Sequence, residues 1–266
     1  MASKICALLV VFVHNVYGQR QLFITPSLGM AFPLSHTIIP ANGDKGYRAN
    51  TFDFGVSLDL SLQYQLNQHW IIFAGWRAGS DTGISFLYGD INTDYQKGRY
   101  STSSYTSRLP VGVQRHLTTQ KWFKLTRRGT TFKNIAGDKN EDMLYLVLFR
   151  LRMLAGFSYN YTVPMTDDNQ LSSFSSGTLT YNVIERNTVS ASLGFTLQFF
   201  DYEKNHIQLT ILYSQGLSQV LRSTVNYELL SGNHEATIGS RGSYLSIQLG
   251  YPIKLVDFSK RRERKI

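Results

Sequence analysis

Cysteine is almost absent from the chain, which has only Cys6 among its 266 residues. Cys6 lies in an N-terminal stretch in which residues 5–13 are apolar and follow Lys4, and residues 16–18 (Val-Tyr-Gly) are compact enough for a signal-peptidase site. We therefore expect residues 1–18 to be a secretory signal peptide. The exported chain then has no thiol, so no disulfide stabilises its fold.

Long apolar runs are also absent. No segment of 18 consecutive apolar residues occurs, which excludes a transmembrane helix by this criterion. Apolar residues instead alternate with polar ones, most regularly in residues 51–64, where every even position is apolar: Phe52, Phe54, Val56, Leu58, Leu60, Leu62 and Tyr64. A period of two indicates a β-strand, and this one is long enough to cross a bilayer at a tilt.

Seven further segments show the same alternation: 22–32, 70–76, 109–113, 149–159, 189–199, 207–213 and 245–253. The joins between these strands are alternately short (66–69 and 201–205) and long (33–50, 81–105, 160–187 and 217–241), and the long ones are rich in Gly, Ser, Asn and Thr. Residues 118–142 break this rule, because they form a long join at the end where short turns are expected. Eight strands with alternating short and long joins are the layout of a transmembrane β-barrel.

The polar face of the strands lacks Lys and Glu. It has Ser, Thr, Gln and Gly instead, for example Ser190, Ser192, Thr196 and Gln198. A soluble barrel would expose this face to water and would carry Lys and Glu there. Small uncharged residues suit the crowded interior of an eight-stranded barrel, so we expect the apolar face to point to lipid. The sequence thus predicts an all-β, eight-stranded antiparallel up-and-down transmembrane β-barrel over residues 19–254, followed by a basic tail at 255–266.

These features together resemble a known group. The signal peptide, the eight alternating strands and a final strand at 244–251 (YLSIQLGY) are similar to the small bacterial outer-membrane β-barrel proteins of the OmpA-membrane-domain and OmpX type. The step Leu109-Pro110-Val111 resembles the proline-containing strand of the PorT-like branch. The resemblance implies a location in the bacterial outer membrane. Two features depart from the pattern: the residues that follow Tyr251, and the insert at 118–142.

Five charged residues fall on the predicted interior face: Asp53, Asp59, Arg77, Arg150 and Arg152. Buried charges are costly unless they are paired. Pairing through the short turn would place Arg77 opposite residue 55 or 57, one diagonal step from the acids. We expect an ion-pair network that plugs the barrel, and the alternative is a gating or proton-relay role.

Catalytic and metal-binding motifs are missing. There is no Gly-x-Ser-x-Gly, and neither a deacylase-type His-x-Ser pair nor an omptin-type arrangement of Asp-Asp with His-Asp is present. His69, His116 and His206 lie at strand ends, but His206 is three strands away from the other two. We therefore expect no catalytic residue, no metal site and no cofactor. A lipid- or peptide-modifying enzyme remains an alternative, because separate loops can contribute catalytic residues.

Basic and aromatic residues are concentrated in the insert at 118–142. The predicted periplasmic contact surface consists of Lys121, Trp122, Phe123, Lys124, Arg127 and Arg128. Exposed aromatic residues beside cations are typical of interfaces. We expect a structural or binding role for the barrel, as an accessory subunit of a secretion or assembly complex, with outer-membrane lipid and a periplasmic or membrane protein as partners. A small-solute channel is a third alternative, and nucleic acid is excluded because the aromatic strand faces are lipid-like.

Overall fold

The computed structural model describes residues 20–258, except 41–46, 50–53, 91–94, 127–128, 133–142, 164–169, 175–176, 201–204 and 230–231. The predicted signal peptide, with Cys6, lies outside the described residues, as do Asp53, Arg127, Arg128 and residues 259–266 of the tail. No helix in the described ranges is long and apolar enough to cross a membrane.

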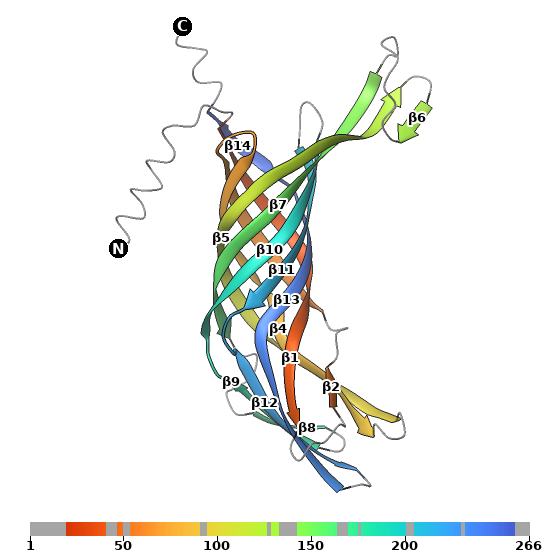
Figure 1. Ribbon diagram of the computed structural model, residues 1–266, viewed down its shortest axis with the longest axis vertical. Helices are drawn as coiled ribbons and strands as arrows, with labels where there is room; N and C mark the ends of the chain where they lie inside the picture. The colour runs from red at the N-terminus through yellow and green to blue at the C-terminus, as the bar shows by residue number, and fades with distance from the viewer. Residues whose placement is uncertain are drawn as a thin grey trace, which may run out of the picture.

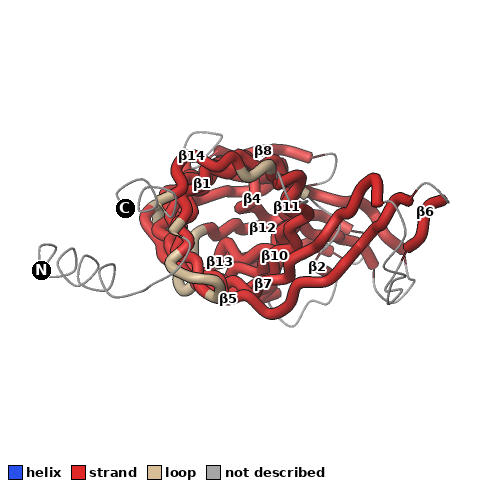
Figure 2. Tube along the Cα trace, turned by 90° about the horizontal axis from the view of Figure 1, so that it is seen from above, coloured by secondary structure: helices blue, strands red, loops and turns tan. Residues whose placement is uncertain are grey.

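Eight long strands form a closed antiparallel barrel (Figures 1 and 2). In their order around the barrel they are β1 (Gln21–Pro40), β3 (Gly55–Gln65), β4 (Trp70–Asp90), β5 (Tyr95–Thr126), β7 (Met143–Val163), β10 (Asn187–Phe200), β11 (Asn205–Gly216) and β13 (Gly232–Gly250). Pairing of β1 with β13 closes the ring. The predicted fold class, an eight-stranded antiparallel up-and-down barrel, is confirmed.

The register fixes the diameter of the barrel. Starting at Pro33 on β1 and following paired residues once around the barrel leads back to β1 at Phe23, ten residues nearer its N-terminal end. A stagger of this size tilts the strands, and eight tilted strands enclose a space that side chains can just fill.

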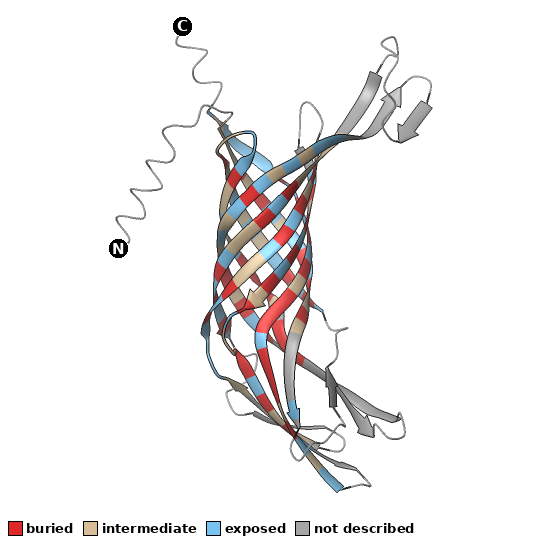
Figure 3. Ribbon diagram, viewed as in Figure 1, coloured by how far each residue is buried: buried red, intermediate tan, exposed pale blue. Residues whose placement is uncertain are grey.

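The two faces of the strands differ as the alternation predicts. On β3, the exposed residues include Val56, Leu58 and Leu60, at 51%, 57% and 44% exposure, whereas Ser57 between them is 1% exposed. Figure 3 shows the same alternation along the other barrel strands. Because every backbone group of a closed barrel is paired along its ladders, such a barrel can stand in hydrocarbon with an apolar outer face.

Small residues on the inner face provide the space that larger ones occupy. Gly112 and Gly156 face each other across β5 and β7. A Cβ atom on Gly112 would lie 2.8 Å from the ring of Phe73, and one on Gly156 would lie 3.3 Å from it. Glycine at these two positions therefore allows an aromatic ring to fit inside the barrel.

The long joins contain more strand than the sequence predicted. The short strands β2 (Tyr47–Ala49), β8 (Gln170–Phe174), β9 (Gly177–Val183) and β12 (Leu221–Leu229) extend the sheet at the lower end of the molecule in Figure 1. A small apolar core supports this extension. Its members, each at most 2% exposed, are Ile84, Val220, Leu221, Val225, Ala236 and Ile238. This end is therefore covered by packed hairpins rather than by irregular loops.

The predicted insert at 118–142 begins inside a strand. Pairing of β5 with β7 continues past the barrel as far as Thr126 and Met143, with register shifts near His116, Lys121 and Leu125. The short strand β6 (Gly129–Phe132) then pairs back on β5. These strands form a projection at the end of the barrel where β1 begins and β14 ends (Figure 1).

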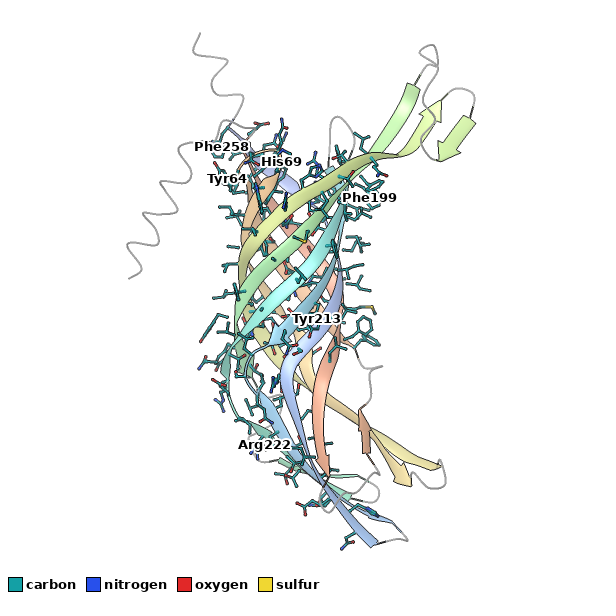
Figure 4. The ribbon with its side chains drawn as sticks, viewed as in Figure 1. Tyr64, His69, Phe199, Tyr213, Arg222 and Phe258 are labelled. Carbon is teal, nitrogen blue, oxygen red and sulfur yellow. The ribbon has the colours of Figure 1, made fainter. Side chains whose placement is uncertain are left out.

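The last strand extends beyond the predicted boundary between barrel and tail at 254. Pro252 has no N–H group, so the ladder is interrupted there. Pairing resumes in β14 (Ile253–Asp257), which lies against the start of β1. Phe258 follows, donating its backbone N–H to the Arg20 carbonyl at 2.9 Å and packing edge-on against Tyr64 with ring centroids 6.3 Å apart (Figure 4).

The assignment of faces predicts that mutations at two positions of β3, one on each face, change the stability of the protein by different amounts. Replacing lipid-facing Leu60 by Arg should lower the free energy of unfolding by about 2 to 4 kcal/mol, because a charge is then placed in hydrocarbon. The matched Ser57→Ala change should cost about 0.5 kcal/mol or less, since the buried Ser57 Oγ makes no hydrogen bond within the described residues. Urea unfolding of both variants in lipid vesicles measures the difference, and equal costs would contradict this assignment of the faces.

Candidate functional site

The interior of the barrel contains one buried ion pair among the described residues. Arg77 Nε donates to Asp59 Oδ2 at 3.0 Å, with 6% and 8% of the two side chains exposed. The two residues are directly opposite each other in the register of β3 and β4. The sequence had placed Arg77 opposite residue 55 or 57. That estimate was wrong by one step on the same face, because the turn at 66–69 sets the pairing Gln65 to Ile71.

Tyr244 joins this pair to a second arginine. The Arg77 Nη1 group donates to the Tyr244 hydroxyl at 2.8 Å. Arg108 lies over the same ring, with its Cζ atom 4.3 Å from the ring centroid, and its Nη2 donates to Thr82 Oγ1 at 2.9 Å. Tyr244 and Arg108 are each 2% exposed. We call Asp59, Arg77, Arg108 and Tyr244 the plug.

The plug closes the barrel. A water-filled passage beside these side chains would leave them exposed, whereas three of them are at most 5% exposed as whole residues. Beyond the plug, Thr82 and Thr106 are hydrogen-bonded to each other at 2.9 Å, and the apolar core of the extension follows. Water therefore has no open path through this section of the described structure.

A small cavity of about 50 Å³ lies next to the plug, and residues of all eight barrel strands line it. The buried polar atoms in this lining that have no hydrogen-bond partner within the described residues include Thr25 Oγ1, Gln114 Oε1, Gln208 Oε1 and Gln248 Nε2. A single water needs roughly 10 to 15 Å³, so the cavity has room for a few waters that satisfy these atoms.

Of the other interior charges predicted from sequence, Arg150 and Arg152 lie apart from the plug. Asp53 lies outside the described residues. Arg152 is 5% exposed and has His116 and Thr196 as its partners in register, while the Arg150 guanidinium lies over the Phe200 ring at 4.6 Å. No ion pair involves either arginine within the described part of the chain, so the network expected from five charges is reduced there to one pair.

Two plug residues were missed by the sequence reasoning, although the parity signal could have found them. Arg108 precedes Leu109 and has the interior parity of its strand. Tyr244 has the interior parity of the last strand, together with Ser246 and Gln248. Tyr244 is also the first residue of the final strand on which the resemblance to outer-membrane barrels depends.

The predicted histidines lie at the end with the short turns, where Figure 4 labels His69. The His69 and His116 rings are 6.5 Å apart, and the His116 N–H donates to the His69 carbonyl at 2.7 Å. The structure does not describe the side chain of His206. Where side chains are described, no group of three or more His, Cys, Asp or Glu could hold a metal ion.

The predicted contact surface is only partly visible. The backbone of Lys121, Trp122, Phe123 and Lys124 belongs to β5 in the projection. Their side chains lie outside the described part of the structure, as do Arg127 and Arg128 entirely. The structure thus places the backbone of residues 121–124 at the end of the barrel where β1 begins.

A closed antiparallel barrel with an apolar outer face and a polar, plugged interior defines an integral β-barrel protein of the bacterial outer membrane. In this class the short turns lie in the periplasm and the long hairpins outside the cell. The end with the short turn at 66–69 and the projection is therefore the periplasmic end, and the extension of β8, β9 and β12 is extracellular.

Comparison with known proteins adds two similar solved structures. The outer membrane protein OprG from Pseudomonas aeruginosa is 12% identical over 90% of this chain and 98% of its own, with a TM-score of 0.43. The translocator domain of the autotransporter NalP from Neisseria meningitidis is 9% identical over 94% of each chain, with a TM-score of 0.17. No protein-family model and no curated protein sequence matches the chain. The assignment to the class therefore comes from the barrel's own two faces.

The buried ion pair predicts a non-additive mutational effect. Asp59→Ala should lower the free energy of unfolding by about 3 to 5 kcal/mol, because the buried Arg77 guanidinium then loses its carboxylate. The double variant Asp59→Ala/Arg77→Met removes both charges and should be more stable than the single variant. Urea unfolding in lipid vesicles tests this order, and a double variant as unstable as the single one would contradict it.

The closed section predicts the absence of conductance. The unmodified protein in planar bilayers should give no discrete channels, whereas Tyr244→Ala should produce conductance steps because it removes the ring between the two arginines. Tyr213→Ala, at a lipid-facing position that is 41% exposed, is the matched control and should remain silent. Channels in the unmodified protein would overturn the plug.

Proposed function

We propose that the protein is a non-enzymatic outer-membrane anchor that presents the β5–β6–β7 projection to a periplasmic protein partner, as an accessory subunit of a secretion or assembly complex. The observation that supports this most is the continuation of β5 and β7 beyond the barrel. At this end β5 stays paired with β7 from Thr118 to Thr126, beyond the roughly 9 to 11 residues that a tilted strand needs to cross the membrane. Barrel closure does not require this extra length.

The composition of the projection favours an acidic partner. The insert at 118–142 contains six Lys or Arg against three Asp or Glu, together with Trp122 and Phe123. Cations attract an acidic surface over several ångströms, and the aromatic residues provide apolar contact area once the surfaces meet. The backbone of residues 121–124 lies in the projecting part of β5, beyond the barrel, where a partner protein can reach it.

The closed interior supports a binding role over transport. Buried side chains fill the section at the plug, so the described interior offers no route for a solute. A rigid closed barrel suits an anchor, because it holds its periplasmic projection and its extracellular hairpins in fixed positions. Surface contacts, and not passage through the barrel, are then the function.

The relationship to the PorT-like branch of OmpA- and OmpX-type barrels belongs to the same proposal. It is supported by Pro110, which lies in β5 facing the interior cavity. Paired residues of β4 and β5 stop at Ala74 with Val111 and resume at Arg77 with Arg108. A proline thus interrupts one barrel ladder, and this strand resembles the proline-containing strand of that branch.

A shortened variant tests the proposed role. Residues 121–148 would be replaced by a four-residue turn that joins Gln120 to Phe149, which are paired in register. We expect this variant to fold, insert and show the same heat-modifiable gel mobility, but to lose its association with the partner. The yield of the partner that co-purifies with this variant from cells should fall more than tenfold.

Photo-crosslinking in intact cells identifies what the projection contacts. A photoreactive residue at position 122 should give specific protein adducts, whereas one at Leu217, which is 57% exposed at the extracellular end, should not give the same adducts. Adducts with lipid alone would replace the protein partner by the inner leaflet of the membrane. No adducts, with an unchanged shortened variant, would return the search for function to the extracellular hairpins.

A further inference from the structure

A second group of interior charges lies on the periplasmic side of the plug. Arg150 and Arg152 are neighbours on the inner face of β7, and β5 places His116 beside Arg152 in register. On the other side, β10 places Gln198 beside Arg150. We call Arg150, Arg152, His116 and Gln198 the mouth cluster. His69 and Phe199, labelled in Figure 4, mark this end of the barrel.

The mouth cluster is strongly cationic. His69, His116, Arg150 and Arg152 are close enough for their charges to interact with each other. The structure describes four acidic side chains, and none serves this cluster. Asp59 pairs with Arg77, Asp257 contacts Gln21 and Lys254, and Glu185 and Glu235 are exposed towards the extracellular end.

Arg152 is the residue that most requires a counter-charge. It is 5% exposed, and no hydrogen bond or ion pair connects it to another described residue. A buried guanidinium without a partner is costly, and buried charges in proteins are normally paired. Since the neighbouring charges are all cationic, the missing partner is an anion.

The donors of the cluster suit a phosphate group. Two arginines at positions i and i+2 of one strand lie on the same face, with their Cα atoms about 7 Å apart. Each guanidinium group offers a planar fork of N–H donors. Bidentate pairing of such forks with phosphate oxygens is strong and directional. The buried His116 Nδ1 and Gln198 Oε1 atoms have no hydrogen-bond partner in the described structure and can bind further phosphate oxygens or a phosphate hydroxyl.

Access to the cluster is from the periplasm. The plug closes the barrel on the extracellular side, whereas Arg150, at the open end, is only half-buried and is held by its stacking on Phe200. A phosphate group can therefore reach Arg150 first and Arg152 behind it. A phosphate in the periplasm and the headgroup of an inner-leaflet phospholipid both present this chemistry at that end.

We propose that the mouth cluster is a binding site for a phosphate group that enters the barrel from the periplasm. This site is independent of the projection and of its partner. Its ligand compensates the charge of Arg152, which the chain itself leaves uncompensated within the described residues.

Binding is tested on the refolded full-length protein in an uncharged detergent and phosphate-free buffer. Isothermal titration with inorganic phosphate forms one arm, and titration with a short-chain phosphatidylglycerol forms the other, with the corresponding diacylglycerol as the phosphate-free control. Binding of phosphate alone identifies free phosphate as the ligand, and binding of the phospholipid alone identifies the headgroup. Binding of neither probe would overturn the proposal.

Two matched variants locate the site. Arg152→Gln should weaken binding of whichever probe binds by at least tenfold. Arg222→Gln makes the same change in charge at an exposed position at the extracellular end (Figure 4) and should leave the affinity unchanged. Equal affinities in the two variants would show that the probe binds elsewhere.

Urea unfolding tests the same site without a measurement of binding affinity. In phosphate-free buffer, Arg152→Met should raise the urea midpoint of unfolding, because it removes a buried charge without a partner. The bound probe should raise the midpoint of the unmodified protein and leave that of the variant unchanged. A lower midpoint for Arg152→Met would show that the chain's own acids pair with Arg152, and the phosphate site would then be rejected.

Discussion

Closure of the hydrogen-bonded ring between β1 and β13 is the constraint on which the rest of the structure depends. In hydrocarbon, an unpaired backbone N–H or C=O group costs several kcal/mol, so a sheet can cross the membrane only when it has no open edge. Closing eight strands with a stagger of ten residues sets one diameter. That diameter leaves an interior that side chains must fill.

The filled interior explains the character of the inner face. Most inward positions carry small or amide side chains, and two glycines face each other where the Phe73 ring enters. Charges inside such a space need partners, and Asp59, Arg77, Arg108 and Tyr244 provide them for each other through contacts from four strands. The plug closes the barrel on one side, and Arg150 and Arg152 lie on its inner face on the other side.

Much of the fold could be predicted from alternation, and the composition of the inner face decided its orientation. Strand count, lipid-facing residues and the inward position of Asp59 and Arg77 follow from parity. The hairpins at the extracellular end were expected as loops because their polar sequences carry no strong alternation, yet pairing with neighbouring strands and burial of Leu221, Val225 and Ile238 order them. Tertiary pairing there overrides weak local preference.

The sequence by itself determined which side of each strand meets lipid, because the side-chain period of a strand is two and needs no knowledge of its neighbours. Only the tertiary structure decided which interior residues meet. Arg77 and Tyr244 are 167 residues apart in sequence, and their contact depends on the register of every ladder between them and on the stagger at closure. A shift of two residues in any ladder keeps the faces unchanged but separates the members of the plug.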